Sequence, residues 1–346
     1  MIGQITWREL VSQPDAWSRL LARAAAGALP QVALRDYDEV VLLGSGTSYY
    51  LAFAAADWIA RRHDVPVRAV ASCEIVLDAH QRRLVAGKKR LVIAISRSGE
   101  SSELILAIDA LRGPGTTILG ISCVATSTLI AKADLPLFLA EGQEDGLVML
   151  RSFTSMLIAL QYMFGTPADR AALRKLPAAG QRVLDDHAEE LRAVANLQPF
   201  DRFVFLASGA SYPIALEASL KVQEMSISTS ETYYSLEYRH GPKATADRNT
   251  LLTLFTLADE QLGLSLARDM KALGVTLLVV GPGAEGYEGI ADMTVPTPAG
   301  MDEGAANVLS LLPLQITAFE TAMRKGKNPD APENLSKVVI LEPAHG

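Results

Sequence analysis

The same pattern of residues occurs twice along this chain of 346 residues, and no other feature restricts its fold as strongly. Residues 38–49 and 201–212 each hold a short apolar run and a turn of the form Ser-Gly-x-Ser-Tyr, and an alanine-rich stretch follows each of them. Further along, the apolar run at 91–96 is matched by the run at 251–256. The repeat of about 160 residues is far longer than the roughly 20 to 50 residues of solenoid repeats. We therefore expect two domains that arose by internal duplication.

Within each copy, apolar runs of four to six residues alternate with amphipathic segments of helical length. This order is typical of a parallel sheet that is covered by helices on both faces. We predict an α/β protein with two tandem doubly wound, flavodoxin-like domains, in which ligands bind beyond the carboxyl ends of the strands. The predicted parts are an N-terminal helical segment (1–30, with a break at Pro14), a first domain (31–165), linking helices (166–197), a second domain (198–327) and an extended tail (328–346).

The composition excludes several classes of partner. A net charge of −7 and a pI near 5.4, without clustered Lys and Arg, argue against nucleic-acid binding. Residues such as Asp57 and Pro313 interrupt the apolar stretches before they reach the length of a membrane span. The N-terminus lacks the residue order of a secretory signal, so a cytoplasmic protein is expected. Cys73 and Cys123 belong to no Cys/His cluster, so neither a metal site nor a redox pair is expected.

The strongest local signal is the turn at residues 96–102, Ser-Arg-Ser-Gly-Glu-Ser-Ser, which follows an apolar run and precedes a helix. Serine hydroxyls and free backbone N–H groups at a helix N-terminus favour a phosphate dianion. The alternative is that Ser101 or Ser102 only caps the helix, but four serines in seven residues exceed what capping needs. Thr47 and Ser48 end the neighbouring strand and are expected to close the same pocket.

The second copy lacks this signal. Its corresponding turn, residues 256–261, has no serine and contains Asp259 and Glu260, whose carboxylates would repel a phosphate. We therefore expect one anion site per chain.

Glu217, Lys221 and Glu224 lie at positions i, i+4 and i+7 and so share one face of a predicted helix. One interpretation is an exposed Glu-Lys pair, which would stabilise the helix by about 0.2 to 0.5 kcal/mol. The other is a set of partly buried carboxylates, because the remaining residues of this helix are mostly apolar. Burial would raise the pKa of a glutamate toward the range of a general base, whereas Lys221 would lower it again.

His240 differs from the other four histidines, which lie in polar surroundings and are expected to be solvated: His63, His80, His187 and His345. The Gly-Pro pair that follows His240 fixes it in a turn. A neutral imidazole there is suited to proton transfer near pH 7, although a lone histidine is more often structural.

At these motifs the sequence resembles the sugar isomerase (SIS) domain family. It is similar to the paired SIS domains of the isomerase half of glucosamine–fructose-6-phosphate aminotransferases. It is closer to the stand-alone tagatose-6-phosphate ketose/aldose isomerases or galactosamine-6-phosphate deaminases. The similarity covers about residues 40–339, and the N-terminal motifs Thr6-x-x-Glu9 and Gln13-Pro-x-x-Trp17 resemble the stand-alone group.

The resemblance implies a substrate site for the phosphate group of a sugar. The residues that match the phosphate-binding positions of the family are Thr47, Ser48, Ser96, Ser98 and Ser101. Arg97 stands where the aminotransferases have glutamine, and its guanidinium would add a charged contact to the phosphate.

The resemblance also implies catalytic roles. Glu224 matches the enolisation base of the family, and Lys221 and Glu217 match the pair that supports it. His240 matches the residue that opens the sugar ring in the partner subunit's active site, so a homodimer is implied. Lys337 matches a tail lysine that contacts the sugar and can form an imine with its carbonyl.

The implied activity is an aldose/ketose isomerisation, in some cases with deamination, of a hexose or hexosamine 6-phosphate without a metal or organic cofactor. Met149 and Arg151 replace a serine and a lysine of the aminotransferases, which weakens the case for glucosamine or fructose as the sugar. No glutaminase domain is expected before residue 1. The alternatives are a fructosamine-6-phosphate deglycase and a non-catalytic module that binds phosphosugars.

Overall fold

A computed structural model describes residues 2–78, 80 and 88–341 of the chain. The chain divides into two compact units. The first-repeat unit comprises residues 15–145 and 151–173 and the tail from Ser336, and the second-repeat unit comprises the residues up to Pro14, 146–150 and 174–335.

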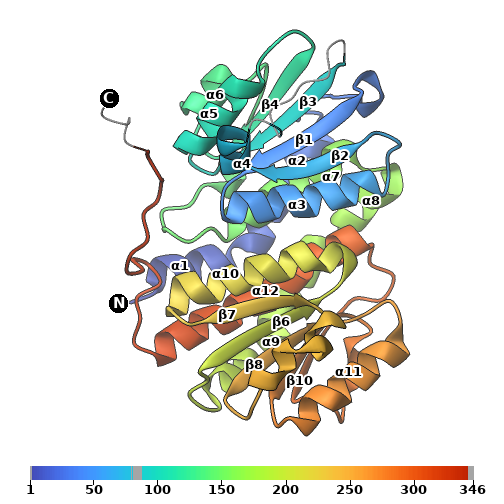
Figure 1. The fold of residues 1–346 in the computed structure, drawn as a ribbon, viewed down its shortest axis with the longest axis vertical. Helices are drawn as coiled ribbons and strands as arrows, with labels where there is room; N and C mark the ends of the chain where they lie inside the picture. The colour runs from blue at the N-terminus through green and yellow to red at the C-terminus, as the bar shows by residue number, and fades with distance from the viewer. Residues whose placement is uncertain (1, 79, 81–87, 342–346) are drawn as a thin grey trace. The chain divides into compact units, whose positions relative to one another are not determined.

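The first-repeat unit is built on a five-stranded parallel sheet in the order β2-β1-β3-β4-β5. Its strands are β1 (Glu39–Gly44), β2 (Val67–Ala71), β3 (Arg90–Ile95), β4 (Thr116–Ser122) and β5 (Leu135–Phe138). Its helices are α2 (Gln13–Ala25), α3 (Thr47–Ala60), α4 (Ser72–Leu77), α5 (Ser102–Leu111), α6 (Thr128–Lys132), α7 (Arg151–Phe164) and α8 (Pro167–Leu173), with short 3-10 turns at Leu34–Asp36 and Ala140–Gly142. Helices α5 and α6 cover one face of the sheet, and α3 and α7 cover the other (Figure 1).

The second-repeat unit repeats this topology with a parallel sheet in the order β10-β9-β8-β6-β7. Its strands are β6 (Arg202–Ala207), β7 (Ser230–Tyr234), β8 (Thr250–Phe255), β9 (Thr276–Pro282) and β10 (Met293–Thr297). Its helices are α1 (Gln4–Val11), α9 (Leu176–Asn196), α10 (Tyr212–Ser226), α11 (Glu260–Ala272) and α12 (Glu303–Arg324), with 3-10 turns η3 (Gly209–Ser211), η4 (Glu237–His240), η5 (Pro242–Thr245) and η6 (Ala284–Tyr287). Helices α9, α10 and α12 pack on one face and α11 on the other (Figure 1).

The central strands explain why both faces need helices. Every residue of β3 and of β8 is buried, as expected for strands of a parallel sheet that is covered on both sides. The predicted fold class, two tandem doubly wound α/β domains, is therefore confirmed.

The strand order also fixes where a ligand is expected. In each sheet the direction of winding reverses between two neighbouring strands, β1 and β3 in the first and β6 and β8 in the second. Ligands of such sheets bind at this reversal, beyond the carboxyl ends of the strands. The turns that follow β1 and β3 are the ones that hold the predicted phosphate-binding residues.

The N-terminal helical segment differs in one detail from its prediction. Helix α1 ends at Val11 and α2 begins at Gln13, so the break lies at Ser12 and not at Pro14. Pro14 fits the first turn of α2 because the N–H groups of a first helical turn have no partner within the helix. Among the residues that the structure describes, no helix is both long and apolar enough to cross a membrane.

Candidate active site

The turn between β3 and α5 is held in shape by its own serine hydroxyls. Ser96 Oγ accepts a hydrogen bond from the backbone N–H of Gly99 (3.0 Å), and Ser98 Oγ accepts one from the N–H of Glu100 (3.2 Å). The two hydroxyl oxygens lie 3.4 Å apart. Both act as acceptors within the turn, so at least one hydroxyl hydrogen can be donated to a bound anion.

Gly99 is required in this turn for two reasons. Its φ of +69° is in the left-handed region, and a Cβ atom at this position would lie 2.3 Å from Ser127 Oγ. Only glycine satisfies both restrictions.

The alternative that Ser101 only caps the helix is not supported. Ser101 directly precedes α5, but among the described residues its side chain makes no capping hydrogen bond. The neighbouring Ser102 interacts with the tail, because its N–H donates to Val339 O (3.3 Å) and its Oγ accepts from Leu341 N (3.0 Å). The described structure therefore shows no capping hydrogen bond from the Ser101 side chain.

Arg97 is almost fully buried beside a carboxylate that the sequence analysis did not single out. Its Nη1 lies 3.6 Å from Oε2 of Glu144, and the side chains are 7% and 0% exposed. Glu144 also accepts hydrogen bonds from the N–H (3.1 Å) and the hydroxyl (2.6 Å) of Ser152 at the start of α7. A buried charge needs such partners, so Glu144 both compensates Arg97 and fixes the start of a helix.

A cavity of about 560 Å³ opens beside this turn within the first-repeat unit. Its lining residues are Arg97, Ser98, Glu100, Cys123, Val124, Gln143, Glu144, Asp145, Arg151, Lys337 and Val338. The volume is in the usual range for small-molecule sites. Burial, the largest influence, holds the pKa of the Cys123 thiol far above its ordinary value, so Cys123 is neutral there.

The structure thus brings three predicted residues, Arg97, Ser98 and Lys337, to one cavity. The Lys337 ammonium donates to the backbone carbonyls of Glu144 (3.0 Å) and Asp145 (3.1 Å). Thr47 and Ser48 are not in this lining. They are buried at the start of α3, after β1, the strand that pairs with β3.

In the second-repeat unit, helix α10 holds the predicted charged residues in direct contact. Lys221 Nζ lies 3.1 Å from Glu217 Oε1 and 2.5 Å from Glu224 Oε2. The side chains of Lys221 and Glu217 are 0% exposed and that of Glu224 is 16% exposed, so the interpretation as an exposed surface pair is wrong. Burial by itself lowers the pKa of Lys221, but the two carboxylates outweigh it and raise the pKa above its ordinary value.

Consequently Lys221 is charged at neutral pH, and Glu224 is the member of the cluster that a molecule in solution can reach. Among the described residues, no group of three or more His, Cys, Asp and Glu side chains is arranged to hold a metal ion.

His240 ends η4 and is exposed. Gly241 follows with a φ of +135°, and Pro242 begins the next turn, so the expected turn is present. Of the other histidines, His63 is not simply solvated, because its Nε2 is 2.8 Å from the carbonyl oxygen of Phe164. His345 lies outside the described residues.

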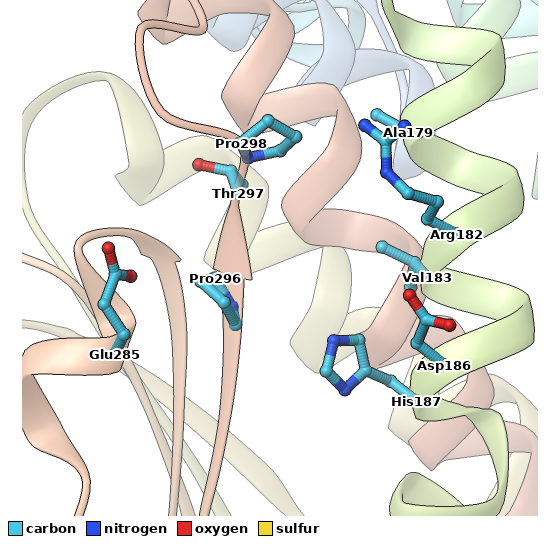
Figure 2. Close-up of a pocket in the computed structure, with 9 residues that line it drawn as sticks. All are labelled: Ala179, Arg182, Val183, Asp186, His187, Glu285, Pro296, Thr297 and Pro298. Carbon is cyan, nitrogen blue, oxygen red and sulfur yellow. The ribbon is translucent and has the colours of Figure 1, made fainter.

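A second cavity, of about 340 Å³, lies in the second-repeat unit between α9 and the segments around η6 and the end of β10. Figure 2 shows Arg182, Asp186 and His187 on α9 facing Pro296 across it. None of the predicted site residues lines this cavity. It also lies at the edge strand β10, away from the reversal between β6 and β8, so it is not the predicted site.

Comparisons with known proteins agree with the repeat. The model of the SIS domain family matches residues 33–165 and 197–323. Among curated proteins, a glutamine–fructose-6-phosphate aminotransferase of Pyrobaculum aerophilum is 28% identical over 354 residues, covering 97% of this chain and 57% of the relative. The enzyme of the same name from Acidithiobacillus ferridurans is 30% identical, covering 89% and 52%. The chain thus spans little more than half the length of these relatives.

Solved structures of similar length match the whole chain. A glucosamine-6-phosphate deaminase from Thermotoga maritima has a TM-score of 0.81 at 28% identity and covers 98% of this chain and 100% of its own. A tagatose-6-phosphate ketose/aldose isomerase from Escherichia coli has a TM-score of 0.85, covering 99% and 98%. Its identity of 23% makes it evidence for the fold alone.

Proposed function

Because the chain belongs to the SIS domain family, of which it contains two tandem copies, we propose that it is a phosphosugar isomerase. The proposed substrate is a hexose or hexosamine 6-phosphate, and the proposed reaction interconverts aldose and ketose, with loss of ammonia when the substrate is an amino sugar. Relatives named as sugar-phosphate aminotransferases and a neighbour named as a deaminase support this class of enzyme.

The observation that carries the proposal is the buried cluster on α10. Lys221 is fully buried between Glu217 and Glu224, and buried ion pairs of this kind are often no more stabilising than apolar residues of similar volume. A structural role is therefore a weak explanation for them. Glu224 alone keeps some exposure, as a general base must if it is to meet a substrate.

We propose that the turn at 96–101 binds the phosphate group. Ser96, Ser98 and Ser101 would donate hydroxyl hydrogens, Arg97 would contribute its charge, and Thr47 and Ser48 would complete the site from the end of the neighbouring strand. A phosphate fixed in this way orients the sugar carbons for reaction without a metal or organic cofactor.

We propose that His240 assists opening of the sugar ring and that Glu224 then carries a proton between C1 and C2 through a cis-enediol or an enolamine. Lys221 would stabilise the carboxylate of Glu224, and Lys337 would polarise the substrate carbonyl or form an imine with it. With an amino sugar, the proton transfer produces an imine at C2. Water then adds to this imine and releases ammonia, leaving a ketose.

A panel of substrates tests this proposal. The purified protein is incubated with hexose, hexosamine and fructosamine 6-phosphates while ketose formation and free ammonia are followed. Conversion of a hexose or hexosamine 6-phosphate supports the proposal. Cleavage of fructosamine 6-phosphates alone would indicate a deglycase, and binding without conversion of any member would indicate a non-catalytic module.

The double variant Ser96→Ala/Ser98→Ala is expected to bind phosphorylated sugars about 10- to 100-fold more weakly, because a hydrogen bond to a charged group contributes about 1.5 to 3 kcal/mol. Isothermal titration calorimetry measures the change. Ser228→Ala, which removes a hydroxyl from the other unit, is the control and should bind like the parent. Equal affinity of the double variant and the parent would place the phosphate elsewhere.

We further propose a cytoplasmic homodimer in which His240 acts in the active site of the partner subunit. His240→Ala and Glu224→Gln are each expected to be nearly inactive. After the two variants are mixed, unfolded and refolded together, about a quarter of the parent activity should return, because half of the dimers are hybrids and each hybrid has one intact site. A mixture that stays inactive would show that His240 acts within its own chain.

A further inference from the structure

Glu144 has no role in the reaction proposed above, although it lines the cavity of about 560 Å³ that holds three of the proposed site residues. Its side chain is 0% exposed. Through its carboxylate and its backbone carbonyl it contacts three segments of the first-repeat unit, at Arg97 after β3, at Ser152 in α7 and at Lys337 in the tail. Glu144 is therefore the residue at which these three segments meet.

The first turn of α7 fixes the Glu144 carboxylate. Oε1 accepts a hydrogen bond from the backbone N–H of Ser152 at 3.1 Å, and Oε2 accepts one from the Ser152 hydroxyl at 2.6 Å. The N–H groups of a first helical turn have no partner within the helix, and the helix dipole favours a negative charge at this end. The carboxylate is thus held on a rigid element of the unit.

The same carboxylate orients Arg97. Glu144 Oε2 lies 3.6 Å from Nη1 of Arg97, whose side chain is 7% exposed. Through its other terminal nitrogen, Nη2, the guanidinium donates to the backbone carbonyl of Lys337 at 3.4 Å. A guanidinium is planar and its N–H groups point in fixed directions, so a carboxylate beside one terminal nitrogen decides where the other one points. Glu144 therefore directs the donor that holds the Lys337 backbone.

Lys337 is also held at the far end of its side chain. Its ammonium donates to the backbone carbonyl of Glu144 at 3.0 Å and to that of Asp145 at 3.1 Å. Glu144 thus acts on Lys337 at two points, on the ammonium through its own carbonyl and on the backbone through Arg97. A lysine has a long and flexible side chain, and contacts at both of its ends fix its position and its direction together.

From this arrangement we propose that Glu144 is a positioning residue for Lys337. Its carboxylate acts through the Arg97 guanidinium, and its backbone carbonyl receives the ammonium. All of these groups belong to the first-repeat unit. The inference rests on the proposed function for the use of Lys337 on the substrate carbonyl. The placement of the lysine by Glu144 can be tested without any activity.

The experiment compares the full-length parent with Glu144→Gln, Arg97→Gln and the double variant. Glutamine at position 144 keeps an oxygen that can accept from Ser152 but loses the charge that holds Arg97. The first measurement is the rate at which N-hydroxysuccinimide acetate acylates Lys337, followed by peptide mass spectrometry with the exposed Lys175 as the internal reference. Each single variant is expected to raise this rate several-fold, because an amine that is released from its acceptors reacts more readily.

The double variant tests whether the Glu144 carboxylate acts through Arg97. If it does, Arg97→Gln alone already removes this route. Adding Glu144→Gln should then change the acylation rate of Lys337 by less than about twofold, since the effects of two residues that act through one contact are not additive. Effects of the two substitutions that multiply would contradict the proposed route.

Amide hydrogen exchange separates positioning from a purely structural role. In Glu144→Gln the exchange of residues 152–155 should stay close to that of the parent, because the glutamine oxygen still accepts from the N–H of Ser152. A structural role would give the opposite pair of results, faster exchange at the start of α7 and unchanged acylation of Lys337.

Asp169→Asn is the matched control. The Asp169 carboxylate accepts from the N–H (2.8 Å) and the hydroxyl (2.7 Å) of Thr166 and lies 3.2 Å from Arg62, an arrangement like that of Glu144. Neither Thr166 nor Arg62 lines the cavity or belongs to the tail. Acylation of Lys337 should therefore be the same in this variant as in the parent.

The second measurement is steady-state kinetics with whichever sugar phosphate the protein converts. Glu144→Gln is expected to lower kcat about 10- to 100-fold, since small displacements of a catalytic group cost rates of this size. Asp169→Asn should keep the kcat of the parent.

If Glu144→Gln fails to fold, Arg97→Gln and the double variant, which removes both charges of the buried pair, carry the same comparison. Unchanged acylation of Lys337 in the folded variants would overturn the inference, whatever the activity. Faster acylation in a protein that converts no sugar phosphate would support the positioning of Lys337 and would contradict the proposed function instead.

Discussion

Replacement of Glu224 by glutamine is expected to lower kcat by about 10²- to 10⁴-fold, the usual contribution of a general base, while the affinity for the sugar phosphate stays close to that of the parent. The amide has nearly the shape of the carboxylate but cannot accept the proton from the substrate carbon. The Glu224 side chain is only 16% exposed and contacts the Lys221 ammonium, and the amide oxygen of glutamine can still accept a hydrogen bond from it.

The most direct measurement for Glu224→Gln is the incorporation of deuterium at C1 or C2 when the sugar phosphate is incubated in D₂O. Enolisation is required for this exchange, so it should be lost together with turnover. Glu260→Gln, an exposed carboxylate at the start of α11, is the control and should exchange like the parent. If Glu224→Gln still exchanges deuterium at the parent rate, another group is the base.

The fold could be predicted from the sequence because the patterns that define it are local and occur twice. Apolar runs of strand length, each followed by a glycine-containing turn and a helical stretch, leave few arrangements other than a parallel sheet with helices on both faces. The turn at 96–102 could be recognised for the same reason. Its glycine, serines and helix start are adjacent in the sequence.

Glu144 could not be recognised in this way, because its partners are distant in the sequence. Arg97 precedes it by 47 residues, and Ser152 follows it by eight. In the sequence it is one acidic residue next to another in a segment without regular period, and such residues are usually solvated. Glu144 is buried because three segments of the chain pack together around it, and no local sequence pattern indicates this packing.

The cluster on α10 lies between these cases. Helical spacing placed Glu217, Lys221 and Glu224 on one face, but the sequence left open whether that face is exposed. The answer depends on what packs against α10, and α12 and strands β6 and β7 are its main neighbours in the unit. For this reason the pairing could be predicted from the sequence, whereas the complete burial of Lys221 could not.

This burial leads to a second large effect, on stability. Lys221→Met is expected to lower the free energy of unfolding by about 3 to 5 kcal/mol at neutral pH, because removal of one partner leaves buried carboxylates without their compensating charge. The double variant Glu217→Gln/Lys221→Met, which removes a charge of each sign, should recover part of the loss. Equilibrium urea unfolding measures all three proteins.

The pH dependence gives an independent check, since the folded pKa of Lys221 is raised above its ordinary value of 10.5. A raised pKa means that the stabilisation is fully present below pH 10.5 and is lost as the pH rises through the folded value. On the alkaline side, the difference in unfolding free energy between parent and Lys221→Met should therefore narrow above pH 10.5. A loss below about 1 kcal/mol at neutral pH would contradict the buried ion cluster.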